Sequence, residues 1–230
     1  YASSAGALIG YSENSITISG ITVINATFAS TGGDGNNSIG GVIGHINNGA
    51  TITDCDVTMN IDGQSNDYAG GIVGYSDGNV NINKANVSIT STSTSYFNAL
   101  GGIIGYSSTG HQSISNVFVD GTLTISNDNG SNTYLGGIIG YGEYVEVNSA
   151  VINADAVVGA DTIQCAHLGT ATQGIFDNVC GLNSTYSHFD TMGIGSWSWK
   201  GTGSYYQRYD SFDDADWFNF DNNIWKTGTS

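Results

Sequence analysis

The chain has 230 residues, no proline, and 20 acidic residues against four basic ones, which gives a formal net charge of -16. Nucleic acids and anionic membrane surfaces are bound by clustered Lys and Arg, so we expect neither partner. No segment approaches the run of about 18 apolar residues that a transmembrane helix needs, so we expect no membrane insertion. The chain begins without Met, and we expect it to be processed or part of a longer protein.

The polar residues are mainly Ser, Thr, Asn, Asp and Gly, which favour turns and strand surfaces. Long helices draw instead on residues such as Glu, Lys and Arg. Only three of the acidic residues are glutamates, namely Glu13, Glu143 and Glu146. The composition therefore predicts an all-β protein.

A six-residue motif, Gly-[Gly/Ala]-apolar-apolar-Gly-[Tyr/His], occurs five times, starting at residues 6, 40, 70, 101 and 136. The starts are 34, 30, 31 and 35 residues apart. Each motif is followed by a second pattern, apolar-x-x-apolar-x-apolar, as in Ile52-Cys55-Val57. The second half of this pattern alternates as a strand with one buried face does. Such a period is typical of a solenoid, in which equivalent strands of successive coils stack in parallel about 4.8 Å apart.

We therefore predict an all-β fold, a parallel β-solenoid (β-helix) of about five to six coils over residues 1–185. A degenerate sixth coil is expected near residue 166, with residues 167–170 replacing the glycine motif and 176–179 the second strand. The motif glycines are expected to allow positive φ and close approach between coils. Residues 186–230 hold all four Trp residues, and we interpret them as an aromatic-rich C-terminal cap. A separate ligand-binding module is the alternative.

The two central apolar residues of each motif are adjacent, so they face opposite ways unless the chain bends between them. One interpretation places one of each pair outside, as an apolar stripe of Leu8, Val42, Ile72, Ile103 and Ile138. Such a stripe, together with the uncapped edge of a first coil, suggests that copies pack end to end or side by side into a filament. The alternative is a corner bend that turns both residues inward.

The run Gly-Gly-Ile-Val-Gly-Tyr of residues 70–75, followed by Ile82, Ala85 and Val87, resembles the GLUG repeat of secreted and surface proteins. Those proteins include bacterial adhesins and large surface proteins of microbial eukaryotes. The resemblance covers roughly residues 5–180. It implies a β-solenoid, an extracellular or cell-surface location, and an adhesive or scaffolding role, and it brings no catalytic residues.

The three cysteines differ in their surroundings. Cys55 falls at the position that Ala85 and Val117 occupy in other repeats, so it is predicted to be a buried, small apolar residue. Cys165 and Cys180 lie at the degenerate coil. We predict a disulfide between them that pins the solenoid to the cap, with two free thiols as the alternative.

Candidate glycosylation sites are the Asn-x-Ser/Thr acceptors, whose number chance accounts for in this composition. They are Asn25, Asn36, Asn86, Asn129 and Asn183. Asn86 lies between inward-facing Ala85 and Val87, so it is expected to point outward.

One acidic cluster could hold calcium, which binds about six to eight oxygen ligands. It comprises Asp210, Asp213, Asp214 and Asp216. The segment lacks the glycine and terminal Glu of an EF-hand loop, so we favour a solvated acidic loop and expect no other cofactor.

Parallel β-helices also include enzymes that act on polysaccharides, and such enzymes need specific catalytic groups. Glycoside hydrolases need two carboxylates at a defined separation, whereas Asp54 and Asp56 share one strand and are both expected to face outward. Arg208, the only arginine, lies in the tail, and His45 takes the Tyr position of its motif, as a wall residue would. We predict no catalytic residues.

These observations predict a non-catalytic, extracellular structural protein, a rigid spacer or a fibre or filament segment of a cell surface or matrix. Its expected partners are copies of itself or other surface and matrix proteins. Two alternatives stay open. One is a carbohydrate-binding adhesin that holds glycans with the aromatic tail, and the other is a polysaccharide-degrading β-helix enzyme.

Overall fold

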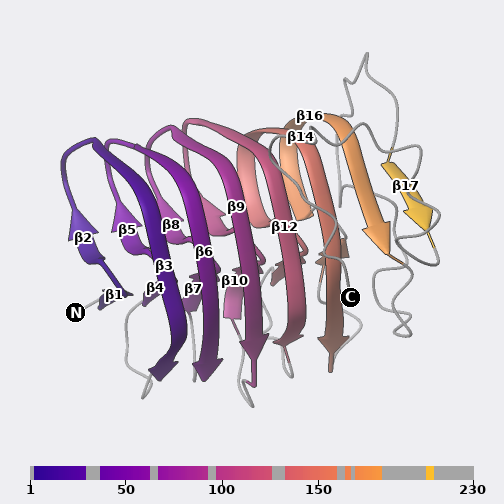
Figure 1. Cartoon of the computed structure of the whole chain (residues 1–230), viewed down its shortest axis with the longest axis horizontal. Coiled ribbons are helices and arrows are strands. Elements are labelled where there is room, and N and C mark those ends of the chain that lie inside the picture. The colour runs from indigo at the N-terminus through magenta and orange to yellow at the C-terminus, as the bar shows by residue number, and fades with distance from the viewer. Residues whose placement is uncertain are drawn as a thin grey trace.

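The computed structural model describes residues 3–29, 37–62, 67–92, 97–125, 133–159, 164–166, 169–182 and 206–209. Within them the chain forms β-strands that stack in parallel, coil upon coil, from the N-terminal end onward (Figure 1). The predicted all-β parallel β-solenoid is confirmed. Each coil has two short stretches of strand and one long one, and in the last two coils the second short stretch is continuous with the long strand.

The first short strands end on the first motif glycine in five coils and form a six-stranded parallel sheet. They are β1 Ser4–Gly6, β4 Ser38–Gly40, β7 Asp67–Gly70, β10 Phe97–Gly101, β13 Tyr134–Gly136 and β15 Gln164–Ala166. The second short strands carry the motif Tyr or His, and they are β2 Ile9–Ser12, β5 Ile43–Ile46, β8 Val73–Ser76 and β11 Ile104–Ser107. The long strands are β3 Ile16–Ala29, β6 Ala50–Asp62, β9 Val80–Ser91, β12 His111–Ile125, β14 Ile139–Val158 and β16 Gly169–Leu182. A last strand, β17 Tyr206–Tyr209, pairs with β16.

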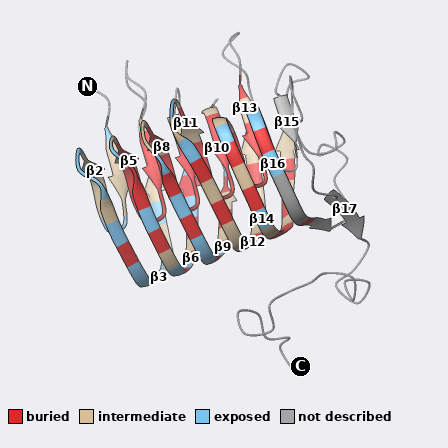
Figure 2. Cartoon of the chain, turned by 90° about the horizontal axis from the view of Figure 1, so that it is seen from above, coloured by how far each residue is buried: buried red, intermediate tan, exposed pale blue. Residues whose placement is uncertain are grey.

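The strand register keeps equivalent residues in columns along the solenoid. Cys55 pairs with Ile21 in the preceding coil and with Ala85 in the next. Cys55 is buried and carries a free thiol, as predicted. Buried and exposed residues alternate along the long strands (Figure 2), so one face of each strand lines a continuous apolar interior.

A column of left-handed residues explains the x-x spacing in the second apolar pattern. Residues three apart on a regular strand face opposite sides, yet Ile52 and Cys55 are both buried. Asp54, between them, has a φ of 54°. The equivalent residues have φ of 70°, 61°, 53° and 58°, and they are Gly20, Lys84, Asn116 and Ser149. The extra residue acts as a bulge that bends the long strand and returns the next side chain to the core.

The motif glycines provide space at the corner between the two short strands. A Cβ added to Gly70 would lie 2.2 Å from the Val73 carbonyl oxygen. One added to Gly71 would lie 2.2 Å from the Gly102 oxygen of the next coil and 2.4 Å from Val87 Cγ1. The predicted close approach is confirmed. The expected positive φ is wrong, because none of the first glycines of the five motifs adopts the left-handed conformation.

The same corner turns both central apolar residues of the motif inward. Val42 and Ile43 are fully buried, and both of their N–H groups donate to the Ile72 carbonyl of the next coil, with N···O distances of 3.0 Å. The outward apolar stripe is therefore wrong. Its members are buried in the described inner coils, and only Leu8 in the first coil is exposed.

The degenerate repeat forms a sixth coil through β15 and β16. Thr170 pairs with Tyr141, and Val179 pairs with Ala150. Of the predicted cap, residues 186–230, only β17 lies within the described residues, so the division of the chain near residue 185 stays a prediction. The described part of the chain contains no helix with the length and hydrophobicity needed to cross a membrane.

Candidate functional site

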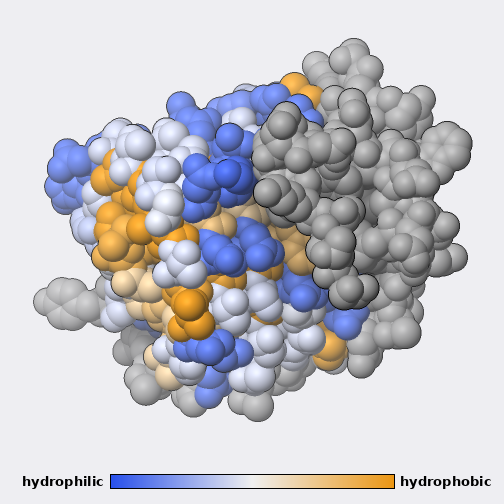
Figure 3. Space-filling model, in the orientation of Figure 1, coloured by the Kyte–Doolittle hydropathy of each residue, from blue (hydrophilic) through white to orange (hydrophobic). Residues whose placement is uncertain are grey.

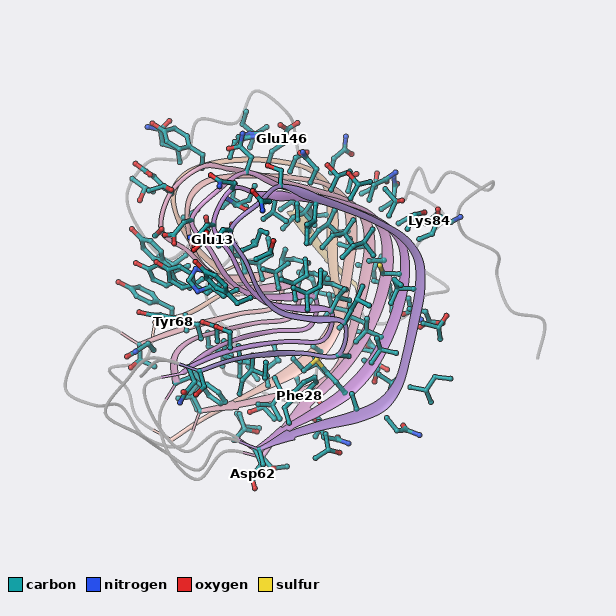
Figure 4. The ribbon with its side chains drawn as sticks, turned by 90° about the vertical axis from the view of Figure 1, so that its left-hand side faces the viewer. Glu13, Phe28, Asp62, Tyr68, Lys84 and Glu146 are labelled. Carbon is teal, nitrogen blue, oxygen red and sulfur yellow. The ribbon has the colours of Figure 1, made fainter. Side chains whose placement is uncertain are left out.

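The last motif residue of each coil forms a column on the outside of the solenoid, which we name the aromatic ladder. It consists of Tyr11, His45, Tyr75, Tyr106 and Tyr141. Successive ring centroids lie 5.1, 4.6, 5.5 and 4.9 Å apart. The last three tyrosines are stacked, with interplanar angles of 4° and 19°, whereas His45 meets both of its neighbours edge-on. Figure 4 shows aromatic rings one behind another on the side of the coil where Tyr68 is labelled.

A second column, on the six-stranded sheet, adds a tyrosine that leans across the corner. The ring of Tyr68 on β7 lies 5.1 Å from that of Tyr75 and 4.7 Å from that of Tyr106, tilted by 49° and 46°. Its neighbours in this column are Ser38 and Ala99, which are small enough to leave it room. Tyr68 therefore ties the six-stranded sheet to two rungs of the ladder.

Tyr134 on β13 repeats this contact at the fifth coil, where its ring lies 5.0 Å from that of Tyr141. Sequence reasoning missed Tyr68 and Tyr134 because they precede the motif and recur in only two of the coils. Their spacing of two residues before the first motif glycine is the signal that relates them.

Asp77, two residues after Tyr75, joins three coils at the edge of the ladder. Its carboxylate accepts hydrogen bonds from the Tyr75 hydroxyl at 3.0 Å and from the Ser108 hydroxyl, and its Oδ2 lies 3.3 Å from His45 Nε2. Burial alone would raise the pKa of Asp77, but these hydrogen bonds and the charge interaction with His45 lower it below its usual value. His45 is thus a wall residue, as predicted, that also contacts an acid of the next coil.

Tyr75 and Tyr106 are neutral phenols at neutral pH. Burial raises the pKa of Tyr75, and the neighbouring acid adds to this rise. Burial, followed by the charges of neighbouring tyrosines, raises the pKa of Tyr106 to about 12. Within the described residues, the Tyr106 hydroxyl has no hydrogen-bond partner, which distinguishes it from Tyr75.

The two acids considered for catalysis both face outward, as predicted, and each contacts the next coil. Asp54 Oδ1 lies 2.5 Å from Lys84 Nζ, and Asp56 Oδ1 accepts a hydrogen bond from the Asn86 amide at 3.1 Å. These carboxylates hold neighbouring coils rather than facing each other across a cleft. The part of the chain that the structure describes contains no group of three His, Cys, Asp or Glu residues placed to bind a metal ion.

The remaining predicted sites are only partly within the described residues. Asn25 and Asn86 are exposed on β3 and β9, so both are placed where a glycan could be attached. The other acceptors, Asn36, Asn129 and Asn183, lie outside the described residues. Glycosylation stays a prediction.

Two further predictions concern the end of the solenoid. Cys165 lies on β15 and Cys180 on β16, in different sheets of the sixth coil, and the disulfide between them stays a prediction. The candidate calcium ligands lie outside the described residues, and they are Asp210, Asp213, Asp214 and Asp216.

The fold and the corner together define a class of protein, a parallel β-solenoid whose coils turn on glycines and carry an aromatic residue outside each turn. The family model of the GLUG motif matches residues 35–62, a stretch that includes β4, β5 and β6. Since the same unit recurs through the described coils, the chain is a GLUG-repeat β-solenoid protein. No curated protein and no solved structure matches the chain.

Proposed function

We propose that the chain is a non-catalytic extracellular structural protein, a rigid spacer or filament segment of a cell surface or matrix. GLUG repeats on a β-solenoid are consistent with an extracellular repeat protein. The observation that carries the proposal is that both the interior and the outer surface link each coil to the next.

The interior supports stiffness because the main-chain hydrogen bonds run along the solenoid axis. Every described pair of neighbouring strands is parallel, and the pairs among β1 to β16 join equivalent residues of successive coils. Stretching or bending the solenoid would break many of these bonds together. The columns of buried Ile, Val and Ala lie beneath them and lose contacts in the same step.

The outer surface repeats the same arrangement with polar side chains. Lys84 pairs with Asp54, and Asn86 donates to Asp56, each one coil away. Ser115 donates to Asn83 Oδ1 at 3.1 Å, also one coil away. Single exposed pairs contribute little, about 0–1 kcal/mol each, but ladders of them fix the register of the coils. A surface used in this way supports a mechanical role better than a catalytic one.

The first coil supports assembly. Its apolar residues are more exposed than their equivalents in the second coil: Val23 and Phe28 are half-buried, whereas Val57 and Ile61 are fully buried. Ile24 is 74% exposed. Apolar colour gathers over β2 and β3 in Figure 3. We propose that a second copy of the chain stacks on this coil. Each column of equivalent residues that joins neighbouring coils would then continue into the copy.

Sedimentation velocity at micromolar concentration tests this function. We expect assemblies larger than a monomer, and we expect Leu8→Asp to dissociate them without unfolding the chain. Ile175→Asp is the matched control, since Ile175 is 50% exposed and Leu8 52% exposed, and Ile175 lies at the other end on β16. A wild-type protein that stays monomeric, or equal effects of the two variants, would contradict assembly through the first coil.

A further inference from the structure

The aromatic ladder holds a chemistry that a spacer does not require. It places phenol rings in contact over several coils, and it places a carboxylate beside two of them, Tyr11 and Tyr75. A phenol loses an electron most readily when its proton passes at the same time to a hydrogen-bonded base, because neither the protonated radical nor the free phenolate is then formed. Only some residues of the ladder have such a base as a hydrogen-bond partner, so the ladder residues differ in how readily they are oxidised.

Two rungs have such a base: Tyr11 donates to Glu13 Oε1 at 3.4 Å and meets the His45 ring, whereas Tyr75 has the shorter bond and meets a second phenol outside the ladder, that of Tyr68. The Tyr75 hydroxyl donates to Asp77 Oδ1 at 3.0 Å, and the pKa of Asp77 lies below its usual value, so the carboxylate is ionised and able to accept at neutral pH. Tyr106, the next rung, has no acceptor among the described residues, and its pKa of about 12 opposes loss of its proton. One-electron oxidation therefore favours Tyr75 over Tyr106, its stacked neighbour.

Tyr68 is placed to react with an oxidised Tyr75. Phenoxyl radicals couple through the ring carbons next to the hydroxyl-bearing carbon, which requires two ring edges to meet. The parallel rings of Tyr75 and Tyr106, with an interplanar angle of 4°, face each other and do not offer their edges. The ring of Tyr68 is tilted by 49° to that of Tyr75 at a centroid distance of 5.1 Å, so the two rings are in contact without being stacked face to face. Because the fold holds the two rings in contact, their effective concentration for coupling is large.

We propose that Tyr68 and Tyr75 form an oxidative cross-linking site, at which two one-electron oxidations join the rings as dityrosine. Each phenol loses one electron and one proton; Asp77 receives the proton of Tyr75 and releases it to water, and the proton of Tyr68 passes to water. The two radicals then form one carbon–carbon bond between ortho carbons, and tautomerisation restores both hydroxyls. The two electrons reduce a two-electron acceptor, hydrogen peroxide to two waters or persulfate to two sulfates.

The product is a covalent link between β7 and β8 across the glycine corner, within one coil. It would prevent the two short strands from separating when the solenoid is strained. The site is a property of the folded coil and does not depend on the proposed structural role, so a monomeric protein would form the link equally well.

Photo-oxidation of dilute protein with tris(bipyridine)ruthenium and persulfate tests the site. Digestion before aspartates releases residues 67–76 as one peptide that contains both rings, since Asp67 and Asp77 bound it. We expect this peptide to lose two hydrogens in mass and to gain dityrosine fluorescence. Tyr68→Phe keeps a ring in place and should abolish the product. Tyr144→Phe, at an exposed tyrosine outside the ladder, should leave the yield unchanged.

Asp77→Asn tests the proton acceptor separately. This variant lacks the cleavage site at residue 77, so the peptide that carries both rings extends over residues 67–119. We expect the link to form several-fold more slowly in this variant, while its circular dichroism matches that of the wild type. An unmodified peptide 67–76 in protein whose other tyrosines are oxidised would overturn the site. A link from Tyr68 to Tyr106 in place of Tyr75 would likewise overturn the site, and an unchanged rate in Asp77→Asn would overturn the role of Asp77.

Discussion

The interior column that contains Val57 should not tolerate a charge, so Val57→Asp should unfold the solenoid at neutral pH. Val57 is 0% exposed and lies between Val23 and Val87 of the adjacent coils. Its Cγ1 would be 2.6 Å from a Cβ added to Gly41, which shows how tightly the corner covers it.

The magnitude follows from two losses. Removing a fully buried valine side chain forfeits about 1.5–3 kcal/mol of burial. Keeping the new acid neutral at pH 7 costs about 4 kcal/mol, which is about three pKa units at about 1.4 kcal/mol each. The sum, about 6 kcal/mol, approaches the whole stability of a typical domain, which is about 5–15 kcal/mol.

Thermal unfolding followed by far-ultraviolet circular dichroism checks this prediction. Asn86→Asp is the matched control, because Asn86 is exposed on the next coil. It loses one hydrogen bond to Asp56 and gains a like-charge neighbour, so its cost should stay below about 1 kcal/mol. Melting temperatures that agree within a few degrees for the two variants would refute the assignment of inward and outward faces.

Three further predictions address the corner, the ladder and the last coil. Gly71→Ala should lower the melting temperature strongly, because its Cβ would meet the Gly102 oxygen at 2.2 Å, whereas Gly20→Asn should be tolerated at a φ of 70° with no atom within 4 Å. Burial raises the pKa of Asp77, but hydrogen bonds outweigh this and lower it below its usual value, so the stabilising contribution of Asp77 is present above the unfolded-state pKa and is lost as the pH falls through the folded-state pKa. Asp77→Asn should therefore lower the melting temperature at pH 7 and reduce its decline in acid. Non-reducing peptide mapping should find Cys165 joined to Cys180, and two free thiols would contradict this.

The repeat could be predicted from the sequence because each column keeps its chemical character from coil to coil. Cys55 was assignable to the core because Ala85 and Val117 fill the same position. The exposed positions of Asp54 and Asp56 followed from the same alternation. Such inferences depend only on local periodicity, which parallel stacking in register preserves along the whole solenoid.

The path of the chain between strands could not be predicted in this way. Two adjacent isoleucines, such as Ile103 and Ile104, suggest one exposed face, but both are buried because the corner bends before the second of them. The bend depends on contacts with the next coil, where one carbonyl accepts both N–H groups. The contact between Tyr68 and the ladder is hidden for the same reason, since it crosses between two sheets.

The register of neighbouring coils is the central claim, and an engineered disulfide tests it most directly. Asn83 and Ser115 are paired residues on β9 and β12, with side chains in hydrogen-bond contact at 3.1 Å, and adjacent strands about 4.8 Å apart meet the geometry of a disulfide. In a chain without the three native cysteines, Asn83→Cys with Ser115→Cys should oxidise to an intramolecular disulfide with native circular dichroism. Asn83→Cys with Phe118→Cys, three residues out of register, should not. Absence of the first link, or equal formation of both, would contradict the parallel, in-register solenoid.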